Sequence, residues 1–174
     1  MLAVLAPVPA WILADGFEVN NPEGVVAFGT GSLEGQNSGA WSFEFFSKPE
    51  IANSRGELRV LIYGSATDLV GKQHELHHPG YVTAVGTYRG MREARAGKHP
   101  RPDFRPKSAL VDDTGYPLFW EVSELRPLAR KHHIPLNKLK LAGVGKLKPH
   151  PGIAPRGPQL IVVPDEFISA ATHG

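Results

Sequence analysis

The sequence predicts an α+β fold, with a curved mixed β-sheet or small β-barrel and short flanking helices. Short apolar runs rich in β-branched and aromatic residues recur along its 174 residues, as is typical of strands. Stretches rich in glycine and proline separate these runs and leave room only for short helices. The length fits one domain over residues 1–174 with a substantial core.

The N-terminal part is predicted to contribute three strands. Residues 4–13 are expected to be extended, because Pro7 and Pro9 cannot occupy a helix interior. Residues 25–28 form a short apolar run that predicts a second strand. Residues 40–46 alternate apolar and polar side chains over most of their length, which favours a third strand over a helix.

The centre of the chain carries the core strands. Three strongly apolar runs, residues 58–63, 81–88 and 119–128, are each predicted to be a strand. Residues 66–78 are expected to hold a short helix, which Pro79-Gly80 ends.

The C-terminal part is predicted to alternate short elements with one long loop. Residues 134–139 are typical of a short helical turn with a proline near its start. Residues 141–158 are rich in glycine, proline and lysine and are predicted to be a loop. Residues 159–163 form a last strand, and Asp165 is expected to cap a short helix that ends at Ala171.

Composition limits the location and the chemistry of the protein. Apolar residues make up 41% of the chain, but no window approaches the roughly 20 apolar residues that a membrane span needs, so no membrane partner is expected. The apolar start lacks basic residues and contains two prolines, so it does not predict a signal peptide. Without cysteine there are no disulfides or thiolate ligands, and the expected location is the cytoplasm.

Charge is unevenly distributed along the chain. Residues 1–70 carry three Lys and Arg against eight Asp and Glu, whereas residues 71–174 carry sixteen against nine. Two basic stretches account for most of the excess. The cations that we expect to contact phosphates are Arg89, Arg92, Arg95, Lys98, Arg101, Arg105 and Lys107 in the first stretch, and Lys138 and Lys140 in the second. This pattern predicts DNA or RNA as the partner, although two hydrated loops without a partner would carry the same charges.

A resemblance to a known family supports this hypothesis. The residues that carry it are 56–63, Thr-Ala-Val-Gly at 83–86, Leu-Phe-Trp-Glu-Val at 118–122 and Ile-Pro-Leu-Asn-Lys-Leu-Lys at 134–140. In this order they resemble the PUA-like superfamily, in particular its ASCH and EVE/YTH-type domains. The resemblance covers residues 56–168 and is weaker over 1–55. It implies binding of RNA or DNA, with a modified base enclosed in an aromatic cage.

The residues expected to line such a base pocket are aromatic or small and polar. Trp11, Trp41 and Trp120 are the only tryptophans, and Tyr63 could supply a further flat wall. Ser65 follows directly after a strand end and could hydrogen-bond to the edge of a base. Each of these aromatic residues could instead be an ordinary core residue.

An alternative function rests on the sequence His74-Glu-Leu-His-His78, which matches the HExxH pattern of zinc hydrolases. In such enzymes His74 and His78 would bind zinc from one helical face, and Glu75 would act as the general base on a metal-bound water. The helix would have to continue past Pro79, and no third ligand is evident from the sequence.

The leading hypothesis is therefore a nucleic-acid-binding module without a cofactor or catalysis, which recognises a modified or flipped base. A zinc-dependent hydrolase is the alternative. A third hypothesis is an interaction domain whose basic face binds an acidic protein. The sequence leaves open the choice between DNA and RNA, and the oligomeric state.

Overall fold

The structure is a computed structural model that describes residues 1–30, 45–46, 48–54, 56–65, 73–111, 116–143 and 146–172. Its strands are β1 Leu2–Pro9, β2 Val25–Thr30, β3 Arg59–Ser65, β4 Tyr81–Val82, β5 Ala84–Glu93, β6 Leu118–Pro127, β7 Ile134–Pro135, β8 Lys140–Ala142, β9 Leu147–Pro149 and β10 Gln159–Val162. Its α-helices are α1 Ala10–Gly16, α3 Pro49–Ala52, α4 Gln73–Leu76, α5 Lys107–Val111 and α6 Ile168–Thr172. Its 3₁₀ helices are η1 Pro102–Phe104, η2 Arg130–His132, η3 Leu136–Lys138 and η4 Asp165–Phe167.

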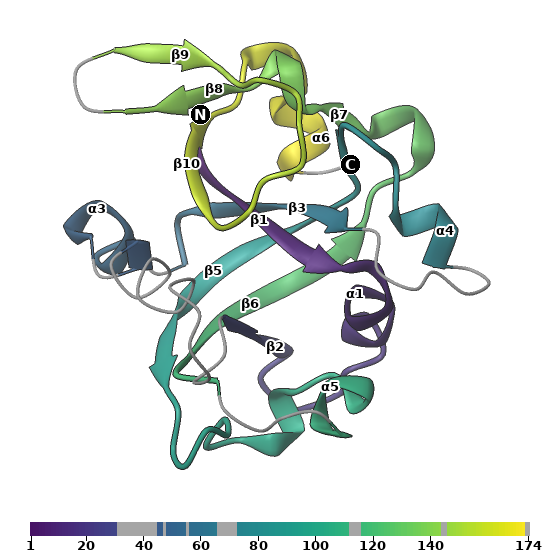
Figure 1. The fold of residues 1–174 in the computed structure, drawn as a ribbon, viewed down its shortest axis with the longest axis vertical. Coiled ribbons are helices and arrows are strands. Elements are labelled where there is room, and N and C mark those ends of the chain that lie inside the picture. Colours follow the sequence, from purple (N-terminus) through teal and green to yellow (C-terminus); the bar gives the residue numbers. More distant parts are fainter. Residues whose placement is uncertain are drawn as a thin grey trace.

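Eight of these strands form one mixed sheet in the order β2-β6-β5-β3-β1-β10-β8-β9 (Figure 1). β1 pairs in parallel with β3, and its other neighbour, β10, is antiparallel. β4 and β7 form a separate two-stranded sheet. Within the described residues the large sheet is not a closed barrel, and β2 and β9 are its edges. The α+β class and the mixed sheet are thus confirmed, whereas the strands that the structure describes do not close into a barrel.

The central strands of the large sheet are buried on both faces, which explains their continuous apolar runs. In β3, Val60 and Ile62 belong to one buried cluster, whereas Leu61 and Tyr63 belong to another. Successive side chains of a strand point to opposite faces, so these clusters cover the two sides of the sheet. Each fully buried aliphatic side chain contributes roughly 1.5–3 kcal/mol to the hydrophobic stabilisation of the fold.

The start of the chain differs from the sequence prediction. β1 ends at Pro9 and α1 begins at Ala10, so only the first part of the predicted strand is extended. A proline cannot occupy a helix interior, but Pro9 lies immediately before the helix, where it lacks only a hydrogen-bond donor that a first turn does not need. Residues 40–44 of the strand predicted at 40–46 lie outside the described residues, and Phe45 and Phe46 are helical.

The C-terminal part also holds an unpredicted hairpin. β8 and β9 lie within the segment predicted to be a loop, and they pair in antiparallel fashion, with Lys140 opposite Pro149 and Ala142 opposite Leu147. Proline is tolerated there because β9 is an edge strand, whose outer N–H groups need no partner strand. The N-cap residue of η4 is Pro164, so Asp165 lies in the first turn and does not act as its cap.

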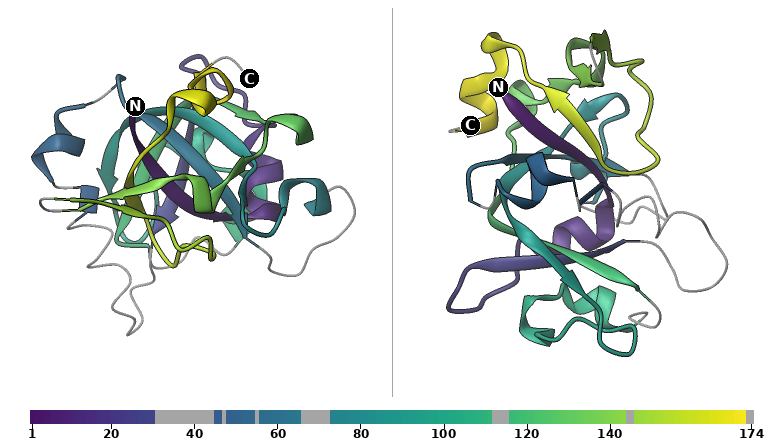
Figure 2. Two further views of the ribbon diagram at one scale, coloured as in Figure 1. Left: turned by 90° about the horizontal axis from the view of Figure 1, so that it is seen from above. Right: turned by 90° about the vertical axis from the view of Figure 1, so that its left-hand side faces the viewer.

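The elements are spread along the long axis of the molecule. In Figure 1 the β8–β9 hairpin and α6 lie at the upper end, whereas α1, α5 and the end of β5 lie at the lower end. The right-hand view in Figure 2 shows the same separation of the hairpin from α5. Across the described residues, no helix is long and apolar enough to span a membrane.

Candidate functional site

An aromatic cluster fills one face of the sheet. Trp120 on β6 lies 5.0 Å from Phe28 on β2 and 6.1 Å from Phe46, measured between ring centroids. Phe46 in turn stacks on Tyr88 of β5 at 5.6 Å. Trp120 is only 3% exposed, so its ring is a core contact as the structure stands.

The residues predicted to line the base pocket do not share one face. Tyr63 belongs to the cluster on the opposite side of the sheet from Trp120, and its ring meets His77 edge-on. Burial raises the pKa of the Tyr63 hydroxyl. Ser65 is half-buried at the end of β3, and Trp11 is half-buried on α1. Trp41 lies outside the described residues.

A small pocket lies instead where β1 meets α1, beside the end of β2. Its lining residues are Val8, Pro9, Ile12, Phe28, Gly29, Arg105 and Tyr116. Phe28 and Tyr116 provide flat apolar surfaces, and Arg105 is the one charged residue in the lining. As it stands, the enclosed space holds only about two water molecules.

Arg105 was predicted to contact phosphates, but its side chain is buried. The residue is 3% exposed, and its Nη1 donates a hydrogen bond to the backbone carbonyl of Ala27. Its guanidinium carbon lies 4.8 Å from the ring centroid of Phe119 and 5.6 Å from that of Tyr116. Such cation–π contacts with a desolvated guanidinium are each worth about 2 kcal/mol. Arg105 thus helps to build the pocket wall.

Gly29 allows Tyr116 to lie directly against β2. A Cβ atom at Gly29 would be 2.6 Å from Cδ1 and 2.7 Å from Cγ of the Tyr116 ring, closer than real Cβ atoms approach. The pocket wall therefore depends on a glycine at the end of a strand. The sequence contained a signal for it in Phe28-Gly29, because a glycine inside a strand often marks a close approach of another group.

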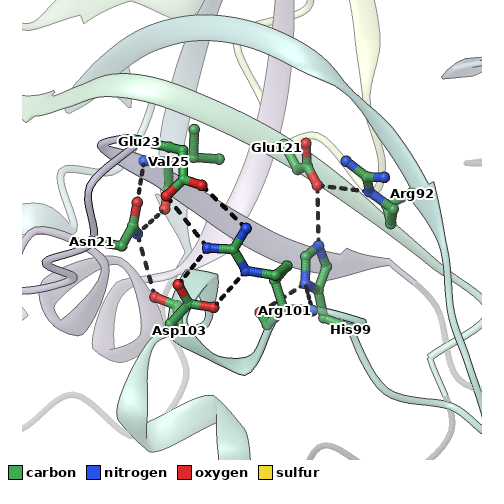
Figure 3. A network of polar contacts seen from close by, with 8 residues as sticks. All are labelled: Asn21, Glu23, Val25, Arg92, His99, Arg101, Asp103 and Glu121. Carbon is green, nitrogen blue, oxygen red and sulfur yellow. Dashed lines mark hydrogen bonds and ion pairs between the residues drawn. The ribbon is translucent and has the colours of Figure 1, made fainter.

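The first basic stretch is held in place by ion pairs, most of them with carboxylates elsewhere in the chain. Glu121 on β6 accepts hydrogen bonds from Nε of Arg92 at 3.0 Å and from Nε2 of His99 at 3.2 Å (Figure 3). The His99 side chain is fully buried and that of Glu121 is 8% exposed. Burial alone would raise the pKa of Glu121, but the hydrogen bonds from His99 and Arg92 together hold it below its ordinary value.

Arg101 is engaged in the same way. Its guanidinium lies between the carboxylates of Asp103 and Glu23, at 2.8 Å and 3.1 Å (Figure 3). The hydrogen bonds from Arg101 lower the pKa of Asp103. Asn21 adds a further contact, since its side-chain amide donates to the carbonyl of Asp103 at 3.3 Å. These contacts anchor the stretch to the turn that precedes β2.

Only part of the first stretch is therefore available to an anion. Arg89, Arg95, Lys98 and Lys107 are exposed, and none has an ion pair within the described part of the chain. Arg92 and Arg101 are also exposed but neutralise carboxylates. The remaining predicted cations, Lys138 and Lys140, are both exposed and lie in the second stretch.

The second stretch belongs to a longer segment, residues 125–164, which contains no Asp or Glu. We call it the cationic segment. Its exposed cations are Arg130, Lys131, Lys138, Lys140, Lys146, Lys148 and Arg156. Within the described residues, none of these cations forms an ion pair with a carboxylate. Their field is therefore not cancelled locally, unlike that of the first stretch.

The two basic stretches do not flank a common groove. The cationic segment lies at the upper end of the molecule in Figure 1, and the loop that follows β5 lies at the lower end, near the pocket. Strand pairing connects Lys140 through Val162 to Leu2 at the start of β1, whereas the pocket includes Pro9 at its end. Eight residues of strand separate these two points by about 23 Å.

A pair of histidines joins the segment before β4 to the segment before β7, the two strands of the small sheet. The Nδ1 atoms of His78 and His133 are 2.8 Å apart, and His78 stacks on Tyr81 at 3.9 Å. Nε2 of His133 lies 3.2 Å from the carbonyl of Leu128, which can only accept, so this nitrogen carries a proton. In the neutral pair, His78 Nδ1–H therefore donates to the bare Nδ1 of His133. Burial and the nearby Arg130 lower the pKa of both rings.

The geometry that the zinc-hydrolase alternative requires is not formed. α4 includes His74 and Glu75 but ends at Leu76, so His78 lies beyond the helix and faces His133. Among the described residues, no three His, Asp or Glu side chains come together as metal ligands would. Gly64 explains how α4 can approach the sheet so closely, because a Cβ atom there would be 1.9 Å from the carbonyl oxygen of Leu76.

Comparison with known proteins gives no assignment. No family model matches the chain, and no curated protein is significantly similar to it in sequence.

Proposed function

We propose that this protein is a non-catalytic nucleic-acid-binding module that recognises a modified or flipped base. The observation that supports it best is the cationic segment, where seven exposed Lys and Arg side chains occur without a carboxylate. The phosphate backbone of a nucleic acid is a common biological anion that binds more tightly as more cations on one surface contact it. The exposed cations Lys138 and Lys140 are its central phosphate contacts.

Three arginines of the first stretch have a different role. Arg92 and Arg101 neutralise carboxylates, and Arg105 is buried. These three residues therefore stabilise the fold, and other residues contact the phosphates. Arg89 remains exposed on β5 beside Gly56, and Lys107 is exposed at the start of α5, near the lower end of the molecule. A nucleic acid that contacts both ends must extend over about 23 Å, or about seven base pairs of duplex.

The pocket beside β2 is the proposed place for a base. Phe28 and Tyr116 offer flat apolar surfaces for its two faces, and Arg105 is a donor that cannot lose its charge. Because the pocket holds only about two waters, the ring of Tyr116 must turn aside when a base enters. The cage in this proposal thus consists of residues other than Tyr63 and Trp120, which lie on opposite faces of the sheet.

Binding is tested by fluorescence anisotropy over a salt series. The probes are oligonucleotides of one sequence, single- and double-stranded, DNA and RNA, each with plain bases or with one methylated or hydroxymethylated base. We expect binding that weakens steeply with salt and a preference for one modified probe. Absence of binding to every probe at low salt would contradict the proposed function. Binding to a polyglutamate peptide that equals binding to DNA would favour an acidic protein as the partner.

The pocket is tested by a pair of glycine substitutions. Gly29→Ala places a methyl group against the Tyr116 ring and disturbs the pocket wall, so preference for the modified probe should fall at least several-fold. Gly157→Ala is the matched control, because its new Cβ atom meets nothing within 4 Å. If Gly29→Ala folds and retains the full preference, the base lies elsewhere.

A further inference from the structure

The β8–β9 hairpin is a two-stranded ribbon at the edge of the large sheet. Only β8 is attached to the sheet, through β10, and all three residues of β9 are exposed. Figures 1 and 2 show the two strands extending past the other elements at the upper end of the molecule. The ribbon therefore presents its paired strands to whatever approaches the cationic segment.

The ribbon has a purely cationic and apolar surface. Lys140, Lys146 and Lys148 are exposed, and no Asp or Glu occurs between Leu125 and Pro164 to neutralise them. Three lysines on one short ribbon repel one another and cost stability unless an anion is close. The lysines occur on both strands of the ribbon, Lys140 on β8 and Lys148 on β9, which is complementary to the phosphates of an extended anion.

The pairing register sorts the ribbon into two faces. Residues directly opposite in an antiparallel pair share a face, so Leu141 and Lys148 lie on one side. Leu141 packs against the buried cluster that contains Ile161, so on β8 this side faces the body of the protein, whereas Lys148 on the outer strand remains exposed. The other side carries Lys140 and Leu147, and Leu147 is 52% exposed. An exposed leucine beside lysines suits contact with base edges and thymine methyl groups.

These dimensions favour one form of nucleic acid. The major groove of B-form DNA is about 12 Å wide and admits a two-stranded β-ribbon. The major groove of A-form RNA is too narrow and deep for side chains to enter. A single strand offers stacking partners, which would require aromatic residues, and β8 and β9 contain none.

We propose that the β8–β9 ribbon enters the major groove of double-stranded DNA, with its lysines on flanking phosphates and Leu147 against base edges. This inference rests on the proposed nucleic-acid binding and adds to it the kind of nucleic acid and the element that contacts it. Sequence preference would then be weak, because the ribbon contributes apolar contacts and no bidentate donors to the groove.

The decisive experiment compares two triple variants with equal loss of charge. The first is Lys140→Ser, Lys146→Ser and Lys148→Ser on the ribbon. The second is Arg95→Ser, Lys98→Ser and Lys107→Ser, in the loop that follows β5 and at the start of α5, which lie at the other end of the molecule. Anisotropy is measured against duplex DNA of about 20 base pairs, two helical turns, and against duplex RNA and single-stranded DNA of the same sequence. Thermal melts confirm that each variant is folded.

We expect the ribbon variant to lower the slope of log K against log salt on duplex DNA by about two to three. The matched variant should change this slope by about one or less. A separate pair tests the apolar contact: Leu147→Ser should weaken duplex DNA binding about five- to tenfold at an unchanged slope, in keeping with the loss of one base-edge contact. Ile153→Ser, a change of another exposed apolar residue in the same segment, should leave affinity unaltered.

Each result has a clear meaning. A folded ribbon variant that binds duplex DNA with the slope of the unaltered protein would overturn the inference, as would equal affinity for duplex RNA. In either case the unaltered protein still binds nucleic acid, so the proposed function survives. If the unaltered protein binds none of the probes, the proposed function fails as well, and the inference fails with it.

Discussion

Replacing Glu121 tests whether the first basic stretch is held by internal ion pairs. Glu121→Ala removes the acceptor for the fully buried His99 Nε2, and an unsatisfied buried donor costs about 1–3 kcal/mol. It also removes the pair with Arg92, whose side chain is 52% exposed, so that pair contributes only about 0–1 kcal/mol. We therefore expect the free energy of unfolding to fall by about 2–3 kcal/mol, and the Tm by about 5–10 °C.

The measurement is urea unfolding followed by circular dichroism, with two companion variants. Glu121→Gln keeps a carbonyl acceptor toward His99 and should cost about 1 kcal/mol, whereas Arg92→Gln should cost about 0–1 kcal/mol. The pKa of Glu121 is lowered in the folded state, so its charge stabilises the fold above an unfolded pKa of about 4.3. The advantage over Glu121→Gln should shrink as the pH falls through the lowered folded pKa. If Arg92→Gln costs as much as Glu121→Ala, His99 is not the partner that matters.

Three further outcomes are expected. The pKa values of His78 and His133 are lowered in the folded state, so the unfolded chain binds protons at a higher pH than the folded protein does. The free energy of unfolding, measured by urea titration, should therefore decrease as the pH falls below about 6.5. This decrease should be less steep in His78→Asn. Gly64→Ala should displace α4, because its Cβ atom would meet the Leu76 carbonyl at 1.9 Å, and faster hydrogen exchange in α4 would report this. Trp120→Ala should cost about 3–5 kcal/mol in unfolding free energy, as a buried aromatic residue does, and a cost below 1 kcal/mol would show that the ring is not a core contact.

The central strands could be predicted because one local property decides them. β3 and the first halves of β5 and β6 are buried and mostly apolar on both faces, and a buried run of that kind has few other structures available. β8 and β9 escaped prediction for the opposite reason. β9 is exposed throughout and β8 is at most half-buried, so neither strand has a continuous apolar run, and only pairing with β10 and with each other makes them extended.

The candidate site was harder to predict, because it depends on contacts between distant residues. Arg105 and Arg101 look alike in the sequence, yet one is buried beside β2 and the other pairs with Glu23, far away in the chain. The counterions of a basic stretch cannot be identified without the fold. Likewise, alternation along β3 predicts which residues share a face with Tyr63. It does not predict that Trp120, on β6, lies on the opposite face of the sheet.

The central position of β1 has a consequence for how the protein is made. β1 lies between β3 and β10, and Val4 is paired with both Val60 and Leu160. While the chain is being synthesised, one edge of β1 must therefore wait for nearly all other residues to emerge from the ribosome. Pairings between such distant residues form slowly, and an unpaired apolar strand attracts other chains. Chains that stop before β10 should aggregate, and cotranslational binding of a chaperone would be concentrated on this N-terminal strand.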